Sequence, residues 1–225
     1  MPVYVYSKTK VYNLGRIEFN CPLRRGILRI GMHHDNSALP YTIIDNTGTI
    51  QIHGRTYLHH GSRLTNRGQI VFHGNDIISH NCVFDIRERL EIGHDVSVGY
   101  ASEITDSDMH FMVDVNDRTV RKNSAPVRIG NYNWLGSHTY IKKGGVTPDY
   151  TIVASPNALI AKDYTVDTPA YSILGGAPAK VIGQGKQRIM KFHSEAVVIE
   201  GIRQSADQVF RLDVSINIDE FCKLL

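Results

Sequence analysis

A run of acidic and imidazole side chains is the first feature of this sequence that suggests chemistry. Asp106, Asp108 and His110 occupy alternate positions, and in an extended segment alternate side chains lie on one face. A histidine beside a carboxylate is suited to general-base catalysis, because the carboxylate fixes the imidazole tautomer and stabilises the imidazolium formed by proton transfer. The other carboxylate would be available to bind a substrate hydroxyl. The sequence does not assign these two roles between Asp106 and Asp108.

The remaining histidines and the cysteines do not suggest a metal centre. The adjacent pairs His33-His34 and His59-His60 project to opposite sides of a strand, which makes each pair a poor bidentate ligand. The three cysteines lack CxxC spacing, so they predict neither a disulfide framework nor a zinc knuckle. We therefore expect no bound metal.

The elements that would position these residues follow a six-residue period. Ile129, Leu135 and Ile141 are six apart, and the residue after an aliphatic one is often small, as at Gly130 and Gly136. A period of six is neither helical nor simply alternating. Sustained short repeats are typical of a solenoid, in which each rung buries its apolar side chains by stacking on its neighbours. The sequence therefore predicts an all-β fold, a β-helix of hexapeptide repeats.

The period also divides the chain. It is clearest over residues 41–183, which we assign to the solenoid, and residues 1–40 are expected to form an irregular lead-in. Residues 109–126 are polar and charged, which predicts a functional loop that leaves the solenoid. Residues 184–225 are expected to form a C-terminal cap and tail, because an approximate 3.6-residue period predicts a helix over the open end of the solenoid.

The same period gives His110 two interpretations. A count of six from Ile104 places His110 at an inward position, where it would be a buried structural histidine. If the chain leaves the solenoid before that point, the imidazole is instead available for catalysis. The start of the polar loop at residue 109 favours the second interpretation.

Composition excludes some classes of partner. The 225 residues carry 25 basic and 22 acidic side chains, too near balance for nucleic-acid binding through bulk charge. No segment approaches the roughly 20 apolar residues that span a bilayer, and the first residues lack a signal-peptide core. We expect a cytoplasmic protein, or one peripheral to the inner membrane. Two basic clusters suggest solvated surface first and a phosphate-bearing ligand second; they are Arg24, Arg25 and Arg29, and Arg118, Arg121 and Lys122.

Several segments resemble those of the hexapeptide-repeat acyltransferases, the left-handed β-helix transferases. They are IGNYNWLGS at residues 129–137, ALIAKD at residues 158–163 and GGAPAKVI at residues 175–182. ITDSDMH at residues 104–110 resembles a segment of the O-acetyltransferases encoded with lipopolysaccharide and capsule biosynthesis genes. The resemblance implies a left-handed β-helix with a C-terminal helical extension, a homotrimer, acetyl-CoA bound between subunits, and His110 as the catalytic base.

The resemblance also implies binding residues. The pantetheine of the donor would follow small side chains at rung corners, and two lysines would meet the CoA phosphates. These residues are Gly136, Ser137, Ala154, Ser155, Ala161, Lys162 and Lys180. Galactoside-acting relatives have an asparagine eight residues before the catalytic histidine. Ser102 stands there in this chain, which argues against a galactoside-like acceptor, and Ser102 and Asp106 become the candidate substrate contacts.

These observations favour an acetyl-CoA-dependent O-acetyltransferase acting on a sugar hydroxyl of a surface-polysaccharide precursor. No serine or cysteine lies in a nucleophile motif, which favours direct transfer in a ternary complex. An N-acetyltransferase acting on an amino sugar and a non-catalytic β-helix scaffold are the alternatives. The γ-class carbonic anhydrases share the solenoid but bind zinc through three histidines, and the loop after His110 offers no second histidine.

Overall fold

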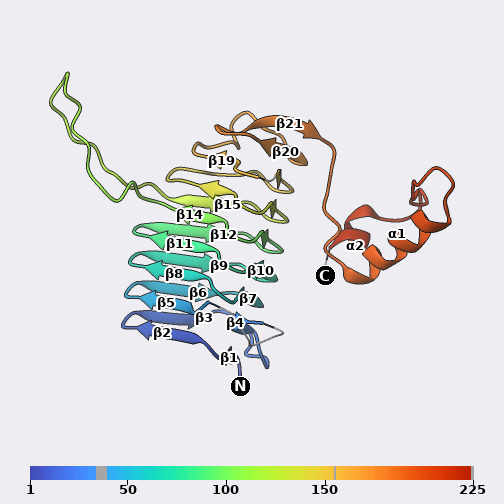
Figure 1. Cartoon of the computed structure of the whole chain (residues 1–225), viewed down its shortest axis with the longest axis horizontal. Helices are drawn as coiled ribbons and strands as arrows, with labels where there is room; N and C mark the ends of the chain where they lie inside the picture. The colour runs from blue at the N-terminus through green and yellow to red at the C-terminus, as the bar shows by residue number, and fades with distance from the viewer. Residues whose placement is uncertain (34–39, 155, 224–225) are drawn as a thin grey trace.

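The computed structural model describes residues 1–33, 40–154 and 156–223, and this part of the chain contains 21 strands and two helices. The strands form three sheets, A, B and C, which are the three sides of a stack of coils (Figure 1). Sheet A contains β1 (Val3–Val5), β4 (Leu28–Met32), β7 (Thr56–His59), β10 (Asp76–Ile78), β13 (Ser97–Val98), β16 (Trp134–Leu135), β18 (Ile152–Val153), β20 (Ser172–Gly175) and β21 (Lys180–Gln184).

The other two sheets complete each coil. Sheet B contains β2 (Thr9–Asn13), β5 (Thr42–Asn46), β8 (Arg63–Asn66), β11 (Val83–Ile86), β14 (Glu103–Thr105), β17 (Tyr140–Ile141) and β19 (Leu159–Ile160). Sheet C contains β3 (Arg16–Phe19), β6 (Thr49–Ile52), β9 (Gln69–Phe72), β12 (Arg89–Ile92) and β15 (Val127–Ile129). Apart from the antiparallel pair β20–β21, neighbouring strands are parallel, so the predicted parallel β-helix is confirmed.

The core is a set of apolar columns along the stack axis. In sheet B, Leu64, Phe84 and Ile104 are register partners, and each is 3% exposed or less. Large apolar side chains suit these positions because each one is buried by stacking on its partners in the neighbouring coils. Phe84 pairs with a residue 20 positions away on each side, whereas Leu135 and Val153 are 18 apart. The two extra residues per coil explain why the six-residue period slips in the first half of the chain.

The stack begins earlier than the sequence predicts. Residues 1–40 were expected to form an irregular lead-in, but β1 to β4 pair in register with the strands above them. Partners in these first coils are far apart in sequence: Thr9 pairs with Thr42, and Leu28 pairs with Thr56. Corners of unequal length therefore hide the period without preventing strand pairing.

The C-terminal segment also differs from the expected cap. The last coil is closed by the hairpin β20–β21, and the chain then runs down beside sheet A to α1 (Phe192–Gln204) and α2 (Ile218–Cys222) (Figure 1). The guanidinium of Arg188 lies 4.9 Å from the Trp134 ring centroid on that sheet. The helices thus extend from the side of the stack. Neither helix in the described part of the chain has the length and apolar character needed to span a bilayer.

Candidate functional site

The loop that carries His110 leaves the stack between β14 and β15 through a short antiparallel neck (Figure 1). The amide of Asp108 donates to the carbonyl oxygen of Asn123 at 2.9 Å, and the amide of Ala125 donates to that of Asp106 at 2.9 Å. Ser107 and Ser124 form an antiparallel bridge between these two bonds. The neck fixes residues 106–110 against the body, while the rest of the loop projects from it.

Asp106 lies inside the stack and supports the backbone. Its carboxylate accepts the amide N–H groups of Arg87, Glu88 and Arg89, at 2.8, 2.7 and 2.7 Å. The residue is fully buried. The predictions that Asp106 shares a face with His110, orients its imidazole or binds substrate are therefore wrong. The chain still follows the coil at Asp106, so this side chain points into the corner between β11 and β12.

His110 and Asp108 lie on the outside and line one pocket. The chain reverses at Met109, whose φ is +64°, and His110 is exposed. The amide of His110 donates to the backbone carbonyl of Asp108 at 2.7 Å. The carboxylate of Asp108 forms an ion pair with Lys143. The interpretation of His110 as a buried structural histidine is wrong, because the chain has already left the stack.

The pocket combines an exposed imidazole with several cations. Its other lining residues are Met112, Val113, Asp114, Thr119, Arg121, Lys122, Asn123 and Lys143. Lys122 pairs with Glu88 at 2.8 Å, and this hydrogen-bonded ammonium lowers the pKa of the Glu88 carboxyl. An imidazole here can accept a proton from a bound hydroxyl, and guanidinium or ammonium groups can hold an anionic part of a ligand.

Sequence reasoning missed Lys143. It lies 33 residues after His110, and no spacing rule connects the two. The signal is the strand register, because β17 pairs directly with β14 and the residues after β17 therefore lie beside the neck. The position of Lys143 beside the neck can be predicted only when the strands before and after the loop have been assigned to their coils.

The predicted donor-binding residues lie on two edges of the stack. Gly136, Ser137 and Ala154 follow β16 and β18 at the edge between sheets A and B. Ala161 and Lys162 follow β19 at the edge between sheets B and C, the edge from which the loop with His110 leaves. A single chain therefore does not bring the two groups together.

The individual surroundings of these residues differ as well. Lys162 pairs with Asp167 at 3.0 Å, and Lys180 is exposed at the start of β21. Ser155 lies outside the described residues. Ser102 is buried; its hydroxyl donates to the carbonyl of Gly136 at 3.3 Å and accepts the amide of Thr139 at 3.1 Å. The prediction that Ser102 contacts substrate is therefore wrong.

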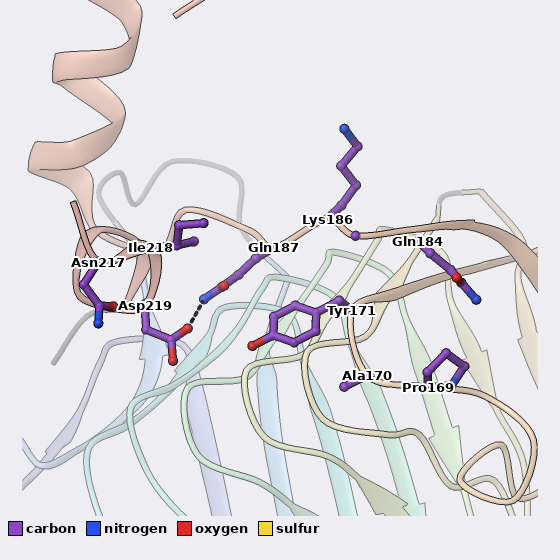
Figure 2. A pocket seen from close by; sticks show the side chains of 10 residues that line it. Pro169, Ala170, Tyr171, Gln184, Lys186, Gln187, Asn217, Ile218 and Asp219 are labelled. Carbon is purple, nitrogen blue, oxygen red and sulfur yellow. Dashed lines mark hydrogen bonds between the residues drawn. The ribbon is translucent and has the colours of Figure 1, made fainter. Parts of the chain in front are cut away.

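A second pocket lies between the C-terminal segment and the corner of the stack that carries Tyr171 (Figure 2). Tyr132, Tyr150 and Tyr171 stack with ring centroids 4.7 and 4.4 Å apart. Gln187 donates to the Asp219 carboxylate at 3.2 Å, as Figure 2 shows, and the Tyr150 hydroxyl donates to the same carboxylate at 3.3 Å. This column is where the C-terminal segment docks on the stack.

No metal-binding group of three or more His, Cys, Asp or Glu side chains is present among the described residues. The histidines that do meet, such as His60 and His80, stack face to face at 5.2 Å. The two imidazole rings of such a pair pack against each other face to face.

The fold is a left-handed parallel β-helix of hexapeptide repeats with a C-terminal helical extension. No protein-family model matches the chain, and no curated protein matches it in sequence. Similar solved structures include a single-residue mutant of AntD, an N-acyltransferase from Bacillus cereus, at 11% identity over 84% of this chain and 91% of that one, with a TM-score of 0.51.

Two further solved structures are similar at lower TM-scores. The polysialic acid-specific acetyltransferase NeuO has 16% identity over 90% of this chain and 96% of its own, with a TM-score of 0.49. The polysialic acid O-acetyltransferase OatWY has 17% identity over 88% and 94%, with a TM-score of 0.47. At such identities the likeness is one of fold.

Proposed function

We propose that this protein is an acetyl-CoA-dependent O-acetyltransferase that acts on a sugar hydroxyl of a surface-polysaccharide precursor, with His110 as general base. The observation that carries the proposal is the exposed imidazole at the neck of the loop, in one pocket with Asp108 and Lys143. The segments that resemble hexapeptide-repeat acyltransferases support it. The proposed site of action is the cytoplasm or the periphery of the inner membrane.

The proposed reaction is a direct transfer between two bound substrates. His110 takes the hydroxyl proton while the oxygen attacks the thioester carbonyl carbon, which forms the new ester bond as the carbon–sulfur bond breaks. The imidazolium then gives its proton to the departing CoA thiolate. Asp108 would act on His110 through the backbone turn that joins them, because its carboxylate is already paired with Lys143.

A homotrimer would complete the donor site. Gly136, Ser137 and Ala154 on one edge and Ala161 and Lys162 on another would meet if neighbouring subunits placed these two edges against each other. The small side chains leave room for a pantetheine chain, and the lysines suit its phosphates. The AntD mutant, which has this fold, was crystallised with dTDP and coenzyme A. That precedent supports coenzyme A as the ligand class.

The test is the variant His110→Ala, assayed by thiol release from acetyl-CoA with a panel of nucleotide sugars and glycan fragments. Loss of a general base costs about 100-fold or more in turnover. His193→Ala, which removes an exposed histidine of α1, is the matched control and should keep full activity. Near wild-type transfer by a folded His110→Ala protein would show that the base is another residue.

A second candidate is N-acetyl transfer to an amino sugar. Another AntD mutant was crystallised with dTDP-4-amino-4,6-dideoxyglucose and coenzyme A, and its TM-score to this chain is 0.50. The same pocket would serve an amine, so the acceptor panel should include amino sugars. A protein that gives no turnover with any acceptor and no thermal shift with acetyl-CoA would instead be a scaffold.

A further inference from the structure

A second cationic pocket lies at the other end of the stack, in its first coils. Four arginines line it together: Arg24, Arg25, Arg29 and Arg55. Arg29 belongs to β4 and Arg55 precedes β7, so the pocket lies on sheet A and on its edge with sheet C. The loop with His110 leaves from the edge between sheets B and C several coils further on (Figure 1). The arginine pocket is therefore separate from the proposed catalytic site.

Strand register builds this pocket. Tyr4, Arg29 and Tyr57 are direct partners on β1, β4 and β7, so their side chains stack on the outer face of sheet A. The Arg29 guanidinium lies 4.6 Å from the Tyr57 ring centroid and 5.9 Å from that of Tyr4. Arg25 lies 5.9 Å from the Tyr4 ring centroid and Arg55 5.9 Å from that of Tyr57. The result is an alternating row of guanidinium groups and rings.

The tyrosine rings of this row do not neutralise the charges of its guanidinium groups. Ring faces attract cations but carry no net charge. No acidic side chain lines the pocket and none of the four arginines forms an ion pair, among the described residues. Like charges that line one pocket repel one another, and a bound anion would reduce this repulsion.

Arg29 also retains an unused donor. Its Nε is buried and has no hydrogen-bond partner among the described residues. A buried donor without a partner is costly, and guanidinium groups match phosphate oxygens in a two-point geometry. A phosphate bound in the pocket would meet the guanidinium groups that line it and lower the charge of the pocket.

We propose that this pocket binds an anion that contains two linked phosphate groups. Four guanidinium groups exceed what one carboxylate can balance, whereas a diphosphate supplies several negative charges and many acceptor oxygens. Each tyrosine ring already lies beside two arginines, so we expect a nucleobase to contribute less to binding than the phosphates. Recognition therefore depends on the phosphates, whether they belong to inorganic diphosphate or to a nucleoside diphosphate.

The test compares pyrophosphate binding by the wild-type protein and by the double variant Arg24→Gln/Arg55→Gln, using isothermal titration at low salt. Both side chains are exposed, so the variant should keep its thermal unfolding curve. We expect the variant to bind pyrophosphate about tenfold more weakly or worse, since it loses two charge-assisted contacts. Arg63→Gln, which removes an exposed arginine from sheet B, should leave binding unchanged.

Two further comparisons test whether the phosphates belong to a nucleotide and whether the planar guanidinium geometry matters for binding. Equal affinities for pyrophosphate and UDP would support recognition of the diphosphate alone, and tighter UDP binding that is lost in the double variant would support a nucleotide ligand. Arg24→Lys/Arg55→Lys keeps the charge without the planar fork, and an affinity between those of the wild type and the glutamine variant would support two-point contacts. No pyrophosphate binding by the wild type, or equal binding by wild type and glutamine variant, would overturn the proposal.

Discussion

At the residue scale, two aspartates of one short segment have different partners and should respond differently to the same change. The Asp106 carboxylate accepts three backbone amides in the interior, whereas Asp108 pairs with Lys143 at the surface. The interaction of Asp106 stabilises the folded backbone. The second belongs to the pocket of His110.

We predict that Asp106→Asn lowers the free energy of unfolding by about 1–3 kcal/mol, because an amide cannot accept all three N–H groups and leaves a buried donor unpaired. Asp108→Asn should change it by less than about 1 kcal/mol, since exposed ion pairs contribute little. Urea denaturation of the two variants checks both values. Equal destabilisation by both substitutions would contradict the separation of roles.

His60 makes stability depend on pH. Burial lowers its pKa below the ordinary value of 6.5, and the stacked ring of His80 acts in the same direction. The unfolded chain therefore binds a proton more readily than the folded protein does. The stability that the protein has with His60 neutral is fully present above pH 6.5. It decreases as the pH falls through that value toward the lower pKa of His60 in the folded protein.

We predict that the midpoint concentration of urea unfolding decreases as the pH is lowered from about 7.5 to about 5.5. His60→Gln should make this decrease smaller. His193→Gln, at an exposed site on α1, is the control and should leave the pH profile unchanged. A wild-type profile that is retained in full by His60→Gln would assign the pH dependence to other groups.

At the element scale, the first coils are joined by a ladder of buried amides. Asn66 donates to Asn46 at 2.7 Å, and Asn46 donates to Asn13 at 2.6 Å. Asn46 and Asn66 are fully buried, while Asn13 is exposed. In a solenoid each coil contacts only its neighbours, so such a ladder links strands that are distant in sequence.

We predict that Asn46→Ala costs about 2–3 kcal/mol, because it removes three side-chain hydrogen bonds of a buried amide, to Asn13, to the carbonyl of Arg16 and to Asn66. Asn13→Ala removes only one bond at the exposed end and should cost about 1 kcal/mol or less. Thermal or urea unfolding of both variants measures the difference. A smaller effect at position 46 than at position 13 would mean that the ladder does not stabilise the coils.

The elements differ in how far their sequence defines them. Ile129, Leu135 and Ile141 predict the coils because stacking repeats one environment at a fixed spacing. The first coils escaped prediction because corners of unequal length separate paired strands such as β2 and β5. The C-terminal helices were predicted to cap the stack, but their position depends on a tertiary contact between Asp219 and Tyr150 that no local pattern encodes.

The same distinction applies to the site. His110 could be singled out because its loop interrupts the period. Asp106 was misassigned because an alternating pattern assumes one extended segment, whereas the chain still follows the coil at Asp106 and has left the stack by His110. Lys143 was missed because its position beside the neck follows from the pairing of β14 with β17, which is a property of the assembled stack.

At the scale of the whole molecule, the projecting loop carries apolar side chains that the single chain leaves uncovered. Phe111, Met112 and Val115 are 68%, 68% and 82% exposed. Exposed apolar groups gathered on one segment are typical of an interface. In the proposed homotrimer this loop would pack on a neighbouring subunit and bring His110 to the donor groove between the two chains.

We predict that Phe111→Ser/Val115→Ser weakens self-association, because it removes apolar area that the assembly would bury. Sedimentation equilibrium should show a shift from trimer toward monomer at low micromolar protein. Val214→Ser, which changes a fully exposed apolar residue of the C-terminal segment, is the control and should leave the mass unchanged. Acetyl transfer should fall with the trimer fraction and recover at high protein concentration, since the residues of the donor groove would come from two subunits. Activity that did not depend on protein concentration in a monomeric variant would place the whole site within one chain.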